Sequence, residues 1–307
     1  MNKQQTLKMA CLLGVGQLIF SGAQAQNLLE SDYNSGHIFS FTTDGTQSTF
    51  ASGISPGGLA FNTLGDLFES DPGSGNIYRF TPGGVQSTFA SGLDSPSGLA
   101  FNSAGDLFVA DYGGNIFKYT PAGVRSTFVS GLNNPAGLAF SSTGDLFVSC
   151  YYTGYIYEFT SGAVQSIFAS GLDGPAGLAF NNAGHLFAVA EGGGIPGNGN
   201  IYEFQPGGAR STFASGLSIP VGLAFNGMGN LFATDLGSGH IFEFTPDGTQ
   251  SAFASGLDYP TFLAFEPVAE PSTWALLAVS ATALLVCRRK LAAQAFDALR
   301  CSSNDYV

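Results

Sequence analysis

Four tyrosines and one glutamate are the residues of this sequence best suited to hold a ligand. Tyr151, Tyr152 and Tyr155 stand close together, Glu191 opens a glycine-rich run, and Tyr259 stands apart from them. Aromatic platforms with few charges around them suit sugar rings or protein contacts, because each ring offers flat apolar area with a polar tip. We therefore predict a ligand-binding surface that includes these five residues, with neutral drift of loop sequence as the alternative.

The patterns of the common catalytic and metal sites are missing from the sequence. There are three histidines, His37, His185 and His240, and no Ser-His-Asp order, HExxH or CxxC accompanies them. We interpret His185 as a solvated turn residue. The run from Asp71 to Asn76 offers too few oxygen ligands for a calcium site of its own. The sequence thus predicts no catalytic residue, no metal site and no cofactor.

The charge of the chain argues against nucleic acid as a partner. From residue 26 to residue 270 the cations are Arg79, Lys118, Arg125 and Arg210, against twenty carboxylates, so this span has a charge near −16. Such a surface repels a phosphate backbone. In the same span Cys150 is the one cysteine, so no internal disulfide is expected to stabilise the fold.

A repeat of about forty residues must position these side chains. The tripeptide Leu-Ala-Phe begins at Leu59, Leu99, Leu138, Leu178, Leu223 and Leu263, with spacings of 40, 39, 40, 45 and 40 residues. In the second complete copy, four short apolar runs alternate with turn residues: strand A at 98–101, B at 106–110, C at 115–119 and D at 124–129. Four strands in each unit of this length are typical of a β-propeller blade.

The ends of the repeat region predict how the ring closes. The region opens with strands B, C and D at 28–50 and ends with a lone strand A at 262–265. These fragments complete one another, giving five whole blades and one shared blade, with no open edge. We predict an all-β, six-bladed propeller over residues 26–266, with four antiparallel strands per blade.

The departures from the repeat fall mainly in the B–C and D–A loops, which we expect at one face of the propeller. The fifth blade has five extra residues between Ala190 and Gly199, and Cys150 replaces a recurring aspartate just before Tyr151. We expect Tyr151, Tyr152 and Glu191 to lie together where two blades meet. The recurring aspartates that end strand B, such as Asp71, are expected to accept hydrogen bonds from the following turn.

The span from Gly57 to Phe265 resembles NHL-type six-bladed propellers, a superfamily that includes gluconolactonase-like enzymes and the streptogramin lyase. The resemblance implies the architecture. The metal ligands and catalytic residues of those enzymes have no counterpart in this sequence that we can place. Fold similarity alone does not select a function.

Both ends of the chain carry signals for export. Lys3 and Lys8, an apolar run from Met9 to Phe20, and the small residues Ala23 and Ala25 predict a signal peptide over residues 1–25. Residues 271–287 lack charges and precede a basic cluster, which predicts a transmembrane helix with residues 291–307 as a cytoplasmic tail. A buried core helix is the alternative for that apolar run.

The C-terminal segment 267–290 resembles the PEP-CTERM sorting signal of Gram-negative bacteria. The matching residues are Glu270, Pro271, the apolar run, and the cluster Arg288, Arg289 and Lys290, while Ala269 stands where that family has its first proline. The resemblance implies processing by an exosortase-type transpeptidase.

Together these features favour an exported, envelope-anchored, non-catalytic propeller with a binding or structural role at the surface, where exopolysaccharide or another surface protein is the expected partner. A hydrolase or lyase of the gluconolactonase or streptogramin lyase type is the alternative.

Overall fold

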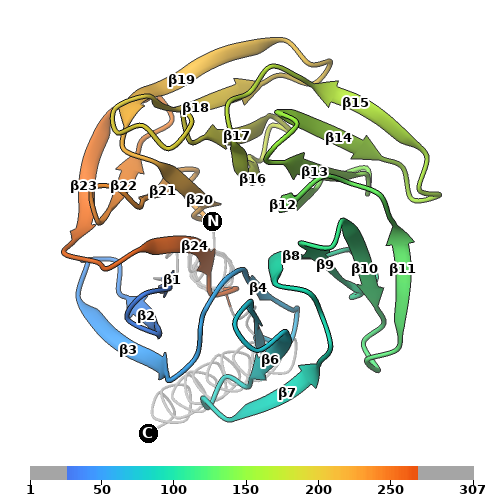
Figure 1. The fold of residues 1–307 in the computed structure, drawn as a ribbon. Coiled ribbons are helices and arrows are strands. Elements are labelled where there is room, and N and C mark those ends of the chain that lie inside the picture. The colour runs from blue at the N-terminus through green and yellow to red at the C-terminus, as the bar shows by residue number, and fades with distance from the viewer. Residues whose placement is uncertain (1–25, 269–307) are drawn as a thin grey trace, which may run out of the picture. The chain divides into compact units, whose positions relative to one another are not determined.

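Six four-stranded sheets form a ring in the computed structural model, which describes residues 26–268 (Figure 1). Residues 26–267 belong to one compact unit. The predicted all-β propeller, with six blades of four antiparallel strands, is confirmed. Within the described residues no helix is long and apolar enough to cross a membrane.

The signals predicted at the two ends lie outside the described residues. They are the signal peptide 1–25 with Ala23 and Ala25, the sorting signal with Glu270, Pro271, Arg288, Arg289 and Lys290, the transmembrane helix 271–287, and the tail 291–307.

Each blade has four strands, which we letter A to D from the centre of the ring outward (Figure 1). The A strands, from blade 1 to blade 6, are β24 (Pro260–Phe265), β4 (Leu59–Phe61), β8 (Pro96–Phe101), β12 (Pro135–Phe140), β16 (Pro175–Phe180) and β20 (Pro220–Phe225). The B strands are β1 (Leu28–Asp32), β5 (Leu67–Asp71), β9 (Leu107–Asp111), β13 (Leu146–Cys150), β17 (Leu186–Ala190) and β21 (Leu231–Asp235).

The outer half of each blade consists of strands C and D. The C strands, in the same order, are β2 (His37–Phe41), β6 (Asn76–Phe80), β10 (Asn115–Tyr119), β14 (Tyr155–Phe159), β18 (Gly199–Phe204) and β22 (His240–Phe244). The D strands are β3 (Gln47–Ser52), β7 (Gln86–Ala90), β11 (Arg125–Val129), β15 (Gln165–Ala169), β19 (Arg210–Leu217) and β23 (Gln250–Ser255). Against the boundaries predicted for blade 3, strand A begins two residues earlier, because Pro96 pairs with Asp111 beyond a bulge.

The two ends of the described chain share blade 1, as the repeat register predicts. Strand β24 pairs antiparallel with β1, with Leu28 opposite Phe265 and Glu30 opposite Leu263. The Glu266 amide continues this ladder by donating to the Asn27 carbonyl at 3.0 Å. The predicted closure is therefore confirmed, and the inner edge of β1 is paired rather than open.

Burial follows the position of each strand in the blade. Every residue of every B strand is buried, since neighbouring blades cover both faces of the sheet there, whereas the first three residues of every D strand are exposed. Phenylalanines connect adjacent blades. Phe108 of strand B contacts Phe128 in its own blade and Phe140 in the next, with ring centroids 5.1 and 5.0 Å apart in edge-to-face geometry.

The seam between blades 1 and 2 departs from this pattern. Blade 1 has Leu29 where the other B strands have phenylalanine, so the edge-to-face contact to the next blade is missing there. At the other seams the inner strands pack so closely that a Cβ on Gly98 would meet the Ala136 carbonyl oxygen at 2.2 Å. Phe262 of β24 fills the matching position in blade 1. The Phe262 side chain occupies the space in which the inner strand of blade 2 would otherwise pack. That strand, β4, has only three residues.

The B–C and D–A loops meet at one end of the propeller, which we call the loop face. Backbone hydrogen bonds join the two sets of loops: Tyr33 donates to Tyr259, and Tyr112 to Asp94. The predicted role of the strand-B aspartates is confirmed at Asp71, whose carboxylate accepts from the Ser74 amide at 2.8 Å. Its second oxygen accepts from the Ser55 amide of the preceding loop at 3.0 Å, so the same carboxylate also holds the D–A loop.

Candidate ligand-binding face

All exposed tyrosines of the described chain lie on the loop face. They are Tyr152, Tyr112, Tyr259 and Tyr33, with 63, 51, 42 and 39% of their surface exposed. The opposite end, where the A–B and C–D turns meet, exposes aliphatic side chains such as Leu64, Val124 and Met228 and no aromatic ring among residues 26–268. Exposed aromatic side chains gathered at one end mark that end as the better candidate for a binding surface.

Tyr151 and Glu191 connect blades 4 and 5 at this face. The Tyr151 hydroxyl donates to Glu191 Oε2 at 2.9 Å, and the Tyr151 amide donates to the Asn134 carbonyl at 3.1 Å. The tyrosine ring lies against Gly174, where a Cβ would come within 3.0 Å of ring atom Cε2. Residue 174 has φ of +65°, a conformation that glycine adopts without strain, and the missing side chain leaves room for the ring.

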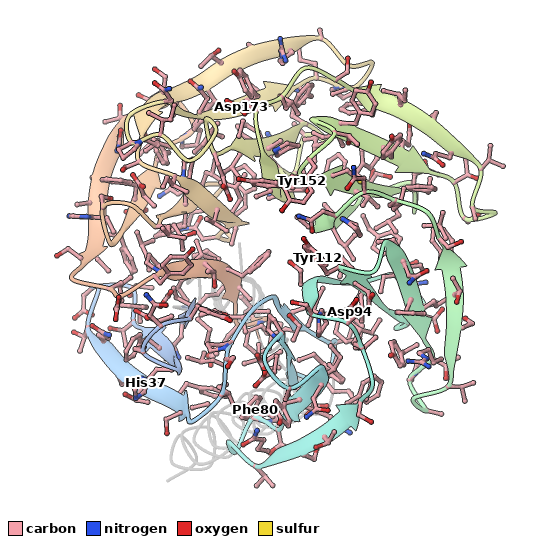
Figure 2. The ribbon with its side chains drawn as sticks, in the orientation of Figure 1. His37, Phe80, Asp94, Tyr112, Tyr152 and Asp173 are labelled. Atoms are coloured by element: carbon pink, nitrogen blue, oxygen red, sulfur yellow. The ribbon has the colours of Figure 1, made fainter. Side chains whose placement is uncertain are left out.

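Tyr152 and Tyr112 extend this contact towards blade 3. The Tyr152 ring packs edge-on against the Tyr151 ring, with centroids 5.3 Å apart. The neighbouring Tyr152 hydroxyl raises the pKa of Tyr112 above its ordinary value, with smaller contributions from burial and from the charge of Asp94. Figure 2 shows Tyr152, Tyr112 and Asp94 in succession along the inner side of the ring. We call Tyr112, Tyr152, Tyr151 and Glu191 together the tyrosine strip, which spans blades 3 to 5.

Burial raises the pKa of both groups at the inner end of the strip, Tyr151 and Glu191. Burial raises the pKa of Tyr151 to about 12, and the adjacent Glu191 adds to the shift. Burial also raises the pKa of Glu191, partly offset by the hydrogen bond from Tyr151. Tyr151 therefore remains a neutral donor at physiological pH. Its half-buried ring forms the base of the strip, while Tyr112 and Tyr152 offer the exposed surface.

Asp173 and Asp94 border the strip at its two ends. The Asp173 carboxylate lies beside the inserted glycine-rich loop, where a Cβ on Gly193 would be 3.1 Å from Oδ2, and its charge adds to the pKa shift of Tyr151. Asp94 lies beside Tyr112 and adds to the shift of that hydroxyl. Both aspartates are exposed. Figure 2 labels them on either side of Tyr152 and Tyr112.

Two of the residues predicted for the binding surface lie away from the strip. Tyr155 is the first residue of β14 and packs against Tyr157, with ring centroids 5.8 Å apart. These two residues share one face of the strand because side chains two positions apart point the same way. Tyr259 lies on the loop face, but in blade 1, where its ring is 6.0 Å from Tyr33.

His185 lies in the A–B turn, as interpreted, but its side chain is only partly solvated. Its Nδ1 lies 2.6 Å from Glu203 Oε1, and both side chains are largely covered. The same two positions hold Asp66 with Arg79 in blade 2, at 2.7 Å. In blade 2 the acid stands in the A–B turn and the base in strand C, whereas in blade 5 the base stands in the turn and the acid in strand C. The strand register alone could therefore have revealed the pair.

Sequence reasoning also missed Tyr112, Asp94 and Asp173 at the strip, and two glutamates inside the propeller. Glu30 and Glu69 are fully buried at the third position of strand B, where Val109 stands in blade 3. Neither carboxylate oxygen of Glu30 has a hydrogen-bond partner, nor does Glu69 Oε2. An alignment of the B strands would have flagged both, since the other four copies have valine or alanine there.

The described residues contain no group of three or more His, Cys, Asp or Glu side chains placed to hold a metal ion. A hollow of about 640 Å³ lies between blades 4 and 5 at the end opposite the loop face. Core rings such as Phe147 and Phe168 and the backbone of two turns line it, with Glu158 as its carboxylate. The side chains of Ser141, Ser142 and Thr143 also line it, but no exposed aromatic ring does, so we favour the tyrosine strip.

Comparisons with solved structures support the propeller architecture. A chain of a nidogen/laminin complex matches with 21% identity and a TM-score of 0.71, covering 79% of this chain and 98% of that one. A streptogramin B lyase matches with 16% identity and a TM-score of 0.62, covering 81% and 92%. A gluconolactonase from Xanthomonas campestris matches with 16% identity and a TM-score of 0.63, covering 77% and 87%.

At these identities the likeness shows a common fold and no common activity. No family model and no curated protein matches the chain.

Proposed function

We propose that this protein is an exported, non-catalytic binding propeller that holds extracellular polysaccharide on its tyrosine strip. The observation that carries the proposal is the gathering of every exposed tyrosine of the described residues on one face, where Tyr112 of blade 3 lies next to Tyr152 of blade 4, whose ring packs on Tyr151 (Figure 2). Sugar rings stack on aromatic rings through their apolar faces, and a strip over three blades suits several sugar units in a row.

The proposed location rests on the two ends of the sequence. The signal peptide 1–25 supports export, and the segment 267–290 supports anchoring in the inner membrane of a Gram-negative envelope, followed by processing by an exosortase-type enzyme. The acidic surface suits a polysaccharide or a surface protein as partner and disfavours nucleic acid.

A glycan array probed with the purified full chain tests the proposal. The double variant Tyr112→Ala/Tyr152→Ala removes the two exposed rings of the strip, and Tyr33→Ala/Tyr259→Ala is its matched control in blade 1. We expect the first variant to weaken glycan binding by about 1–3 kcal/mol, and the control to keep full affinity. An array without bound glycan, or equal loss in both variants, would refute the proposal. Capture of a protein in place of a glycan would instead support the surface-protein partner.

A hydrolase or lyase is the second candidate, and the Tyr151–Glu191 pair is the observation that favours it. Burial holds the pKa of Glu191 above its ordinary value, as in a carboxyl that acts as a general acid. Turnover of lactone and ester substrates by the purified protein tests this candidate. Activity that Glu191→Gln abolishes would replace binding by catalysis as the function of the strip, while equal rates for both proteins, at background level, would exclude the pair as catalytic.

A further inference from the structure

The distribution of charge around the tyrosine strip restricts the ligand. Three aspartates are exposed in the D–A loops of the loop face: Asp94, Asp173 and Asp258. The Tyr112 amide donates to the Asp94 carbonyl at 3.0 Å, and the Gly192 amide, next to Glu191, donates to the Asp173 carbonyl at 3.1 Å, so these two aspartates lie at the two ends of the strip (Figure 2). A ligand on the strip therefore meets a carboxylate at each end of the row of rings.

No Lys or Arg forms an ion pair with these carboxylates within the described chain. All four Lys and Arg residues of the range 26–268 lie in C and D strands. Arg79 and Lys118 pair with Asp66 and Asp106 in the A–B turns, both at 2.7 Å. Arg125 and Arg210 are the first residues of their strands and lie over Phe117 and Tyr202. Arg125 also donates to the Gly92 carbonyl of the D–A loop at 3.5 Å, and it forms no ion pair with Asp94. No described B–C or D–A loop contains a Lys or Arg.

Carboxylates beside exposed aromatic rings form a surface that attracts ammonium groups. The ring face attracts a cation through its quadrupole, and an adjacent carboxylate attracts it through its charge. An anionic polymer such as a polyuronate would meet repulsion at both ends of the strip, without a cation to relieve it. A neutral glycan would use the rings and leave the aspartates unused.

We propose that the tyrosine strip recognises glycans with protonated amino groups, whose sugar rings lie on Tyr112 and Tyr152 and whose ammonium groups pair with Asp94 and Asp173. This inference rests on the proposed function, because it names the class of glycan that the strip holds. The class is a polymer of amino sugars with free amines, as opposed to its N-acetylated or acidic counterparts.

Calorimetric titration of the full chain with three hexasaccharides of equal length tests the inference: β-1,4-glucosamine, β-1,4-N-acetylglucosamine and α-1,4-galacturonate. We expect the glucosamine hexamer to bind about tenfold more tightly than the N-acetylated hexamer, as two exposed ion pairs would supply. The galacturonate hexamer should show no binding. Raising the salt from about 20 to 300 mM should weaken the binding of the glucosamine hexamer alone.

Variants separate the charge from the rings. Asp94→Asn/Asp173→Asn should remove the preference for the free amine while keeping the affinity for the N-acetylated hexamer. Asp258→Asn, on the same face but in blade 1, is the matched control and should change neither. Equal or tighter binding of the N-acetylated hexamer by the native protein would overturn the inference and leave the proposed function standing. Failure of all three hexamers to bind would overturn the inference, and the glycan array would then decide the proposed function.

Discussion

Replacing Glu69 by glutamine should make the protein more stable at neutral pH. Glu69 is fully buried at the seam between blades 1 and 2, and Oε1 accepts one long hydrogen bond, from the Gly57 amide at 3.4 Å. Oε2 has no partner. Burial, with a contribution from Asp71, raises the pKa of this carboxyl from its ordinary value of 4.5 to about 9. The group is thus neutral in the folded protein and ionised in the unfolded chain at pH 7.

The size of the effect follows from this difference in pKa. The folded protein keeps its proton up to about pH 9, while the unfolded chain releases it above 4.5. The free energy of unfolding therefore falls as the pH rises from 4.5 to 9, by about 1.4 kcal/mol per pH unit. By pH 7 the loss amounts to about 3 kcal/mol. Glutamine cannot ionise in either state, so Glu69→Gln should recover most of that loss at pH 7 and little of it at pH 4.5.

Urea unfolding of the full chain, followed by circular dichroism at pH 4.5, 7 and 9, measures this effect. Glu158→Gln, on the half-buried part of β14, is the control for removing a charge, and its unfolding midpoint should differ little from that of the native protein at all three pH values. Glu69→Val copies the residue found in blades 3 and 4 and tests the site without an amide group. If Glu69→Gln and Glu69→Val both keep the pH dependence of the native protein, the reasoning about this carboxyl is refuted.

Three further changes probe other parts of the molecule. Burial, then Asp32, raises the pKa of Glu30 well above its ordinary value, so Glu30→Gln at the ring closure should raise the urea midpoint at pH 8; a lower midpoint there would contradict this expectation. Burial raises the pKa of the Cys150 thiol to about 12, so in a variant with its other cysteines replaced by serine, a thiol reagent at pH 8 should label Cys150 only as fast as the protein unfolds; rapid labelling in the absence of urea would show an open path to it. Deletion of residues 269–307 should move the protein from the membrane fraction to the soluble fraction, and unchanged fractionation on an immunoblot would place the anchor elsewhere.

Several parts of the fold could be predicted from sequence because they depend on local patterns. The recurrence of Leu-Ala-Phe and the turn residues between apolar runs mark each strand independently of the others. The number of blades then follows by counting. The shared blade follows from the order in which strands are missing at the two ends, with β24 completing the sheet of β1 to β3. The loop face is predictable for the same reason, because alternate connections of an antiparallel sheet emerge at the same end.

Other features required the tertiary structure, because they join residues of different blades. Tyr112 and Tyr152, like Asp173 and Tyr151, influence each other's pKa only because blades 3, 4 and 5 bring their loops together at one face. Closeness in sequence was misleading for Tyr155, whose ring turns to Tyr157 along its own strand. The alternation of side chains could have predicted that outcome.

The buried glutamates show most clearly what the sequence determines and what only the structure decides. The sequence alone determines that Glu69 interrupts a column of valine and alanine at the third position of strand B. The structure decides its chemical state, because two neighbouring sheets cover the carboxyl and supply it with a single backbone amide. A pKa depends on how much water and how many partners surround a group, and these are set by chain segments that are distant in sequence.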